Sequence, residues 1–209
     1  ELAKTTGVPL READNKFEAI ASRDAVVEAS GALKALAVSL VKIASDIRLL
    51  ACGPRTGIAE ISIPELQPGS SIMPGKVNPV IPEVVIQVGA QVIGNDAAIT
   101  YGGAFGQLDL NAMMPVMAHN LLQSISLLSA AARVFHERCV SAGPAILGRP
   151  ENVQGITANK ERCRSLIENS LMPVTGLVPT LGYKKAAEIA LEALQTGKTV
   201  REVVLAKKL

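Results

Sequence analysis

Aromatic side chains are scarce in this sequence. Phe, Tyr and Trp together make up 2% of the 209 residues, and Trp is absent altogether. Apolar residues still reach 48%, so the core must be assembled mainly from Ala, Val, Leu and Ile. A core of aliphatic side chains is typical of closely packed helix bundles. The composition therefore favours an all-α protein.

The sequence also lacks an excess of one charge and lacks long hydrophobic runs. It has 21 basic and 19 acidic residues, a net charge of +2, and no basic block. A balanced charge gives no reason to expect nucleic acid or an anionic membrane as a partner. No uninterrupted apolar run reaches the length of about 20 residues that a membrane helix requires. We expect neither a nucleic-acid partner nor a membrane.

Cysteine is sparse as well. An odd number of widely spaced cysteines in a chain of this length is typical of reduced thiols, and we therefore expect a cytoplasmic protein. The two histidines have no Cys or acidic partner at metal-binding spacing, so no metal site is expected. The three cysteines are Cys52, Cys139 and Cys163, and the two histidines are His119 and His136.

Helical spacing of apolar residues dominates the chain. We expect long helices over residues 16–52, from Pro79 to about residue 101, and over 108–139, where Pro115 bends the helix or marks its true start. Gly102, Gly103 and Gly106 are expected to kink or break the second helix. Shorter helices are expected at 159–169, 184–195 and 199–208, and no strand pattern of useful length is present.

These patterns predict an all-α fold, in which a long-helix bundle precedes a small helical C-terminal domain. We expect the partial bundle at residues 1–140, a Gly- and Pro-containing linker or insertion at 141–154, and the small domain at 155–209. Thr157 is predicted to cap the first helix of that domain, and Gly197 and Thr199 to end one helix and cap the next. Glu1 is not Met, and no signal-peptide pattern follows it, so we expect these residues to come from a longer protein.

The segment at residues 69–79, Gly-Ser-Ser-Ile-Met-Pro-Gly-Lys-Val-Asn-Pro, is the strongest functional signal. Its glycines and prolines oppose regular structure, and a helix begins just after it. Inward-pointing N–H groups, Lys76, Asn78 and the positive end of that helix suit a carboxylate or phosphate. Ser70 or Ser71 in such a field could act as nucleophile or base. In the alternative interpretation the serines cap a turn and Lys76 is a solvated charge.

Two further polar features lie on the second predicted helix. Glu83 falls in its first turn, where a negative charge complements the helix dipole and could also reach Lys76. Asn95 and Asp96 interrupt an apolar stretch, and we expect this pair to bridge to a neighbouring helix.

The loop at residues 69–79 resembles the signature loop of the fumarase/aspartase superfamily. Class II fumarases are the most similar members, because this chain resembles them at residues 15–19 and in the Gly102-Gly103-Ala104-x-Gly106 segment. Aspartases share residues 107–111 and the 197–204 tail, so aspartase stays an alternative. The resemblance also includes Gly53-Pro54-Arg55, Ile93-Gly94-Asn95-Asp96, Gly155-Ile156-Thr157-Ala158-Asn159 and Leu181-Gly182-Tyr183.

The resemblance implies a lyase that acts on a four-carbon dicarboxylate without a metal or organic cofactor. In a fumarase it interconverts L-malate and fumarate, a step of the tricarboxylic acid cycle; an aspartase releases ammonia from aspartate instead. Ser70 would be the base, and Glu83 an acidic residue that supports the site. The groups that would hold the carboxylate are Ser71, Lys76, the Val77 backbone and Asn78.

The resemblance also implies a homotetramer whose sites are each built from three subunits. A Thr-His pair and two Ser/Thr/Asn-rich segments, which lie earlier in family sequences, are not among these 209 residues. These residues would therefore carry one part of a composite site and should be inactive alone. A non-catalytic helical assembly protein is the alternative from a different class, and the intact loop argues against it.

Overall fold

The structure is a computed structural model that describes residues 1–141 and 155–209. It divides into two compact units, which are described separately. The first comprises Glu1–Arg48 and Glu65–Gly155, and the second Leu49–Pro64 and Ile156–Leu209. The predicted linker at 141–154 lies outside the described residues except for Ser141. No helix in the described part of the chain combines the length and apolar character needed to cross a membrane.

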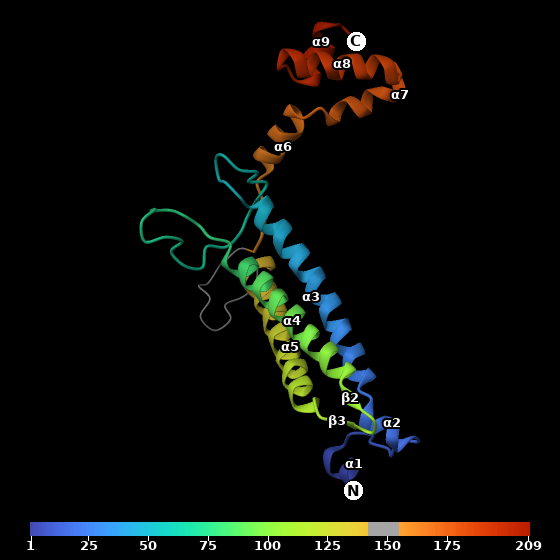
Figure 1. The fold of residues 1–209 in the computed structure, drawn as a ribbon. Helices are drawn as coiled ribbons and strands as arrows, with labels where there is room; N and C mark the ends of the chain where they lie inside the picture. Colours follow the sequence, from blue (N-terminus) through green and yellow to red (C-terminus); the bar gives the residue numbers. More distant parts are fainter. Residues whose placement is uncertain (142–154) are drawn as a thin grey trace. The chain divides into compact units, whose positions relative to one another are not determined.

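Three long helices form the body of the first unit: α3 (Asp24–Leu50), α4 (Val80–Ala104) and α5 (Met114–Phe135). They lie side by side in Figure 1. Ala37 of α3, Val92 of α4 and Leu128 of α5 are almost fully buried against one another, and Leu33, Leu40 and Val88 pack around them. The prediction of an all-α fold built on a long-helix bundle is confirmed.

Shorter elements complete this unit. The short helices α1 (Leu2–Thr6) and α2 (Lys16–Ala21) precede α3, and a turn of π-helix, η1 (His136–Val140), follows α5. Two-residue strands β2 (Gly106–Gln107) and β3 (Leu110–Asn111) pair antiparallel between α4 and α5.

The helix boundaries differ from the sequence prediction at three points. Residues 16–52 are not one helix, because the backbone of Ser22 is extended, with a ψ of 152°, and ends α2. The Arg23 guanidinium donates to the carbonyls of Ala19 and Ser22 at this point. Gly102 and Gly103 do not break α4: a Cβ on Gly102 would lie 2.7 Å from Met117 Cγ, so this glycine allows α5 to approach closely. The third helix begins at Met114, near Pro115, because residues 106–111 form the β2–β3 hairpin.

The second unit contains α6 (Lys160–Asn169), a 3-10 helix η2 (Met172–Leu177), α7 (Val178–Leu181), α8 (Tyr183–Thr196) and α9 (Val200–Ala206). Its core is formed by Ile189, Ala193, Val200 and Val203. Residues 49–64 belong to this unit, and their strand β1 (Ile61–Ser62) pairs antiparallel with β4 (Thr157–Ala158).

The predicted helix ends in the second unit are correct in two cases out of three. Gly197 ends α8 in a left-handed conformation with φ of 67°. Thr199 caps α9 in a capping box, in which the Thr199 hydroxyl and the Glu202 carboxylate bond each other's backbone N–H groups. The prediction for Thr157 is wrong. Thr157 lies in β4, and the residue before α6 is Asn159, whose side chain bonds residues 59 and 62 instead.

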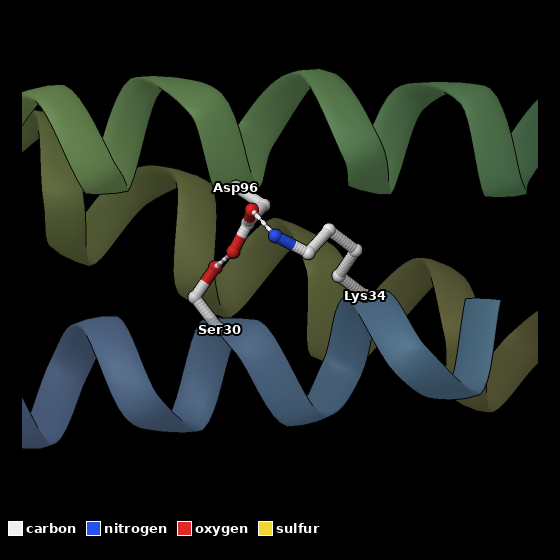
Figure 2. A network of polar contacts seen from close by, with 3 residues as sticks. All are labelled: Ser30, Lys34 and Asp96. Carbon is white, nitrogen blue, oxygen red and sulfur yellow. Dashed lines mark hydrogen bonds and ion pairs between the residues drawn. The ribbon is translucent and has the colours of Figure 1, made fainter. Parts of the chain in front are cut away.

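Asn95 and Asp96 form a polar layer inside the bundle, as the sequence predicted. Figure 2 shows Asp96 of α4 between Ser30 and Lys34 of α3. Ser30 Oγ donates to the Asp96 carboxylate over 2.7 Å, and Lys34 Nζ donates to it over 2.5 Å. Asn95 Nδ2 donates to Ser124 Oγ of α5 over 3.0 Å. Neighbouring residues of α4 therefore bind both flanking helices.

The Asp96 contacts generate a pH-dependent prediction. Burial raises the pKa of Asp96, but hydrogen bonds from Lys34 and Ser30 and the charge of Lys34 bring it below the ordinary value of 3.8. A lowered folded-state pKa means that the carboxylate stabilises the fold above pH 3.8 and loses this effect as the pH falls through the folded-state pKa. Asp96→Asn should therefore lower the free energy of unfolding at pH 7 by about 1–3 kcal/mol.

Urea unfolding from pH 7 to pH 3 checks this prediction. The difference between Asp96→Asn and wild type should shrink at the acid end. Asp46→Asn is the control, because its exposed pair with Lys42 should contribute less than about 1 kcal/mol. If the difference in unfolding free energy between Asp96→Asn and wild type did not vary with pH, the Asp96 carboxylate would not be the source of the pH-dependent stability.

Candidate functional site

Residues 69–79 form an irregular loop in the first unit, between β1 and the N-terminus of α4 (Figure 1). The loop turns at Gly75, which has a φ of 76°. Residues 71–77 are exposed, whereas Gly69, Ser70 and Asn78 are half-buried. The loop therefore exposes Ser71 and Lys76, together with the apolar side chains of Ile72 and Met73, directly before a long helix.

The two ends of the loop are tied together. Asn78 Nδ2 donates a hydrogen bond to the Gly69 carbonyl over 2.6 Å. A Cβ on Gly69 would lie 1.9 Å from the Lys76 carbonyl oxygen, so only glycine allows this approach. We call this contact between Gly69 and residues 76–78 the loop neck. It fixes where the intervening residues leave and rejoin the protein.

The structure distinguishes the two serines. Ser70 Oγ accepts hydrogen bonds from the backbone N–H groups of Ile72 at 3.1 Å and Met73 at 2.9 Å. Ser71 is exposed and makes no hydrogen bond within the described part of the chain. Donors directed at an oxygen favour its anionic form. These two bonds close a turn at Ser70 and direct N–H groups at its hydroxyl oxygen.

The remaining predicted groups lie around the same loop. Lys76 is exposed and forms no ion pair with any residue that the structure describes. Val77 is 45% exposed. Asn78 uses one of its two amide hydrogens at the neck and keeps the other available. The arrangement offers hydrogen-bond donors and one positive charge, which suits a carboxylate.

Glu83 occupies the first turn of α4, as predicted, but its partner is Arg48 rather than Lys76. The Arg48 Nε to Glu83 Oε1 distance is 3.6 Å. The sequence did not single out Arg48. The signal available was its place in the last turn of α3, because antiparallel neighbouring helices bring the end of one beside the start of the next.

Metal-binding geometry is not seen in the described residues: no three His, Cys, Asp or Glu side chains are grouped to hold an ion. His119 is exposed on α5, and His136 Nδ1 lies 3.0 Å from Ser141 Oγ. Neither histidine lies in the 69–79 loop.

Comparisons with known proteins identify the relatives of this chain. Residues 1–94 match the family described as Lyase, and residues 174–209 match the family described as Fumarase C C-terminus. The class II fumarate hydratase of Mycobacterium tuberculosis is 53% identical over 204 residues, which cover 98% of this chain and 40% of the relative. The chain thus spans about two fifths of the length of the curated relatives that it matches.

Two solved structures have the same fold over nearly the whole chain. One is a fumarate lyase:delta crystallin from Brucella melitensis, with a TM-score of 0.87 and 48% identity, covering 100% of this chain and 44% of that one. The other is a class II fumarase from Schistosoma mansoni, with a TM-score of 0.82 and 35% identity, covering 96% of this chain and 39% of that one.

The loop neck makes a structural prediction. Gly69→Ala should force Gly69 and Lys76 apart, break the bond between Asn78 and Gly69, and increase amide hydrogen exchange in residues 69–79. The helices of the bundle should keep their protection. Gly176→Ala is the control, because a Cβ there meets nothing within 4 Å. Unchanged exchange in the loop of Gly69→Ala would show that the neck does not constrain it.

Proposed function

Because the chain belongs to the class II fumarases of the fumarase/aspartase superfamily, we propose that the protein containing it catalyses the reversible dehydration of L-malate to fumarate. The single observation that carries the catalytic assignment is the pair of backbone N–H groups directed at Ser70 Oγ, 3.1 and 2.9 Å away. They stabilise negative charge on that oxygen and so favour Ser70, rather than Ser71, as the base.

In the proposed reaction, the Ser70 alkoxide takes a proton from the carbon next to one carboxylate of malate and becomes a neutral hydroxyl. The electron pair of that C–H bond first spreads onto the carboxylate as a dianionic aci-carboxylate. It then forms the carbon–carbon double bond while hydroxide leaves the adjacent carbon. A group outside these residues protonates the hydroxide to give water. The C–H proton is weakly acidic, so the dianion requires strong electrostatic support.

That support is assigned to the rest of the loop. Lys76 supplies a full positive charge, and Asn78, Ser71 and the Val77 backbone supply hydrogen-bond donors. Donors fixed in place before charge develops lower the barrier by several kcal/mol. The N-terminus of α4 adds its positive dipole end.

Glu83 is proposed to support the site rather than to exchange protons with the substrate. Its ion pair with Arg48 connects the first turn of α4, which follows the loop, to the end of α3. Glu83 lies in the first turn of α4, directly after residues 76–79. This position supports an indirect role for Glu83, in which its ion pair holds residues 76–79 in place.

We further propose a cytoplasmic homotetramer in which the site is completed by residues from other subunits. Many large apolar side chains on the long helices are exposed in the single chain, which supports burial against further copies. Free Cys52, Cys139 and Cys163 agree with a reducing compartment. The exposed side chains include Leu36, Val38, Ile43, Val84, Ile93, Leu122 and Ile125.

Aspartase activity is not favoured, since the similar curated proteins reported above are fumarate hydratases. A non-catalytic assembly role is not favoured either, because the loop keeps its tied neck and all of its polar groups.

Ser70→Ala in the full-length protein should lower kcat for malate–fumarate interconversion by at least about 100-fold, since a general base contributes on the order of 10²–10⁴. The absorbance of fumarate reports the rate. The matched control is Ser165→Ala, on exposed residue 165 of α6, which should be unaffected. Full activity of Ser70→Ala would remove Ser70 from the mechanism. Turnover of aspartate but not malate by wild type would select the aspartase alternative.

The full-length protein should sediment with the mass of four chains, because its exposed apolar helix faces require partners. Analytical ultracentrifugation measures this directly. A strictly monomeric species with full activity would contradict the composite site.

A further inference from the structure

Arg48 and Glu83 form an ion pair beside the candidate site, and both belong to the first unit. Arg48 lies in the last turn of α3 and Glu83 in the first turn of α4. The Arg48 Nε to Glu83 Oε1 distance is 3.6 Å, and the two side chains are 55% and 38% exposed. At this distance the contact is electrostatic rather than a short hydrogen bond, so Arg48 contributes mainly its positive charge.

The place of Glu83 on α4 gives this pair a bearing on the loop. An ion pair as exposed as this one contributes little to the stability of a fold. The Glu83 N–H, however, donates to the Pro79 carbonyl over 3.0 Å, so Glu83 is bonded to the last residue of the 69–79 loop. In an α-helix each side chain leans toward the N-terminus, over the preceding turn. A Glu83 side chain without a partner would therefore lean toward the loop.

Two positive features next to Glu83 would attract an unpaired carboxylate. One is Lys76, which forms no ion pair with any residue that the structure describes. The other is the N-terminus of α4, where the helix dipole favours negative charge. The proposed function assigns both features to a carboxylate of the substrate. An unpaired Glu83 would compete for them and would also repel the dicarboxylate.

The other charges near these ends of α3 and α4 leave Arg48 as the cation that balances Glu83. Residues 84–95, which continue α4 after Glu83, carry no charge. In the second half of α3 the charged residues besides Arg48 are Lys42 and Asp46, and these pair with each other. Arg48 is therefore free to pair with Glu83, and it does so.

We propose that Arg48 is a positioning residue for substrate binding. It holds the Glu83 carboxylate and balances its charge, so that Lys76 and the N-terminus of α4 stay available to the dicarboxylate. This inference rests on the proposed function, because the dicarboxylate is the substrate proposed above. Since the contact depends on charge more than on a directed hydrogen bond, Arg48→Lys should retain most of the effect.

Loss of the Arg48 charge should raise KM more than it lowers kcat. In the proposed reaction the proton moves from malate to Ser70 within the site, so the total charge of the site is the same before and after this step. The uncovered Glu83 carboxylate therefore weakens binding of the dianion and has less effect on the barrier. We expect Arg48→Gln to raise KM about three- to tenfold at low ionic strength. The effect should shrink at high salt, because exposed charges are screened.

The experiment is a double-mutant cycle in the full-length protein, with Arg48→Gln, Glu83→Gln and the double variant. Once Glu83 is uncharged, no carboxylate is left to hold, so Arg48→Gln should cause no further rise in KM in that background. Arg48→Lys should keep a KM close to that of wild type. Lys42→Gln is the matched control, because it uncovers the Asp46 carboxylate on the same helix. Residues 46 and 48 do not face each other on α3, so this control should leave KM unchanged.

The same cycle is repeated on binding alone. Isothermal titration calorimetry measures the Kd of succinate, a four-carbon dicarboxylate that has no hydroxyl to eliminate. Arg48→Gln should raise this Kd about three- to tenfold when Glu83 is charged and should leave it unchanged when Glu83 is replaced by Gln. All values are referred to folded oligomer.

Equal rises in KM and Kd on Arg48→Gln with and without the Glu83 carboxylate would overturn the inference, because Arg48 would then act independently of Glu83. A loss of binding that is as large in Arg48→Lys, and as large at high salt, would assign Arg48 a packing role and would also overturn it. If wild type does not interconvert malate and fumarate, the proposed function fails, and the succinate cycle still tests Arg48. Absence of succinate binding to wild type would overturn the inference as well.

Discussion

The hydrogen bond from the Asn78 amide to the Gly69 carbonyl is the contact on which the candidate site depends. It closes the polar loop at its base, and it is possible only because Gly69 has no side chain to strike the Lys76 carbonyl. With the neck closed, the turn that directs two N–H groups at Ser70 Oγ is confined to a few residues. The same amide lies immediately before α4, so the neck also sets the distance between Ser70 and the positive end of that helix.

Lys76 and Glu83, the charged residues beside the loop neck, do not pair with each other, and this separation suits the proposed chemistry. Lys76 is left without a carboxylate partner in the described residues, so its charge is available to a bound anion. Glu83 would compete for that charge if it turned toward the loop, but Arg48 of α3 holds it instead. In the proposed site, pairing Glu83 with Arg48 leaves that carboxylate balanced by a cation other than Lys76. The Arg48–Glu83 pair is therefore an electrostatic feature of the site as well as a link between helices.

Local signals in the sequence were enough for the longer helices and for the loop. Apolar periodicity located α3, α4, α5, α6, α8 and α9, and the Gly- and Pro-rich composition located the loop at 69–79, whereas the short elements α1, η2 and α7 were not predicted. Contacts between distant residues were not predictable in this way. Nothing near Arg23, Arg48 or Arg162 in the sequence indicates which carbonyl or carboxylate each side chain meets. The error at Thr157 has the same origin, because β4 pairing and the bonds of Asn159 to residues 59–62 override a local capping preference.

The polar layer formed by Asn95 and Asp96 matters for the register of α4 as well as for stability. The Lys34–Asp96 ion pair is only partly buried, because the Lys34 side chain is 45% exposed. Ion pairs inside a protein add little net stability compared with apolar packing, and their clearest use is to specify one register. Asp96 binds Ser30 and Lys34 of α3 while Asn95 binds Ser124 of α5, so α4 is fixed along its axis against both neighbours. A slip of one residue would move α4 by about 1.5 Å. The loop neck is joined to the first turn of α4, so the slip would carry Asn78 with it, by a distance comparable to the misplacement that slows a reaction. The polar layer thus fixes the register of α4, the helix that follows the loop, against α3 and α5.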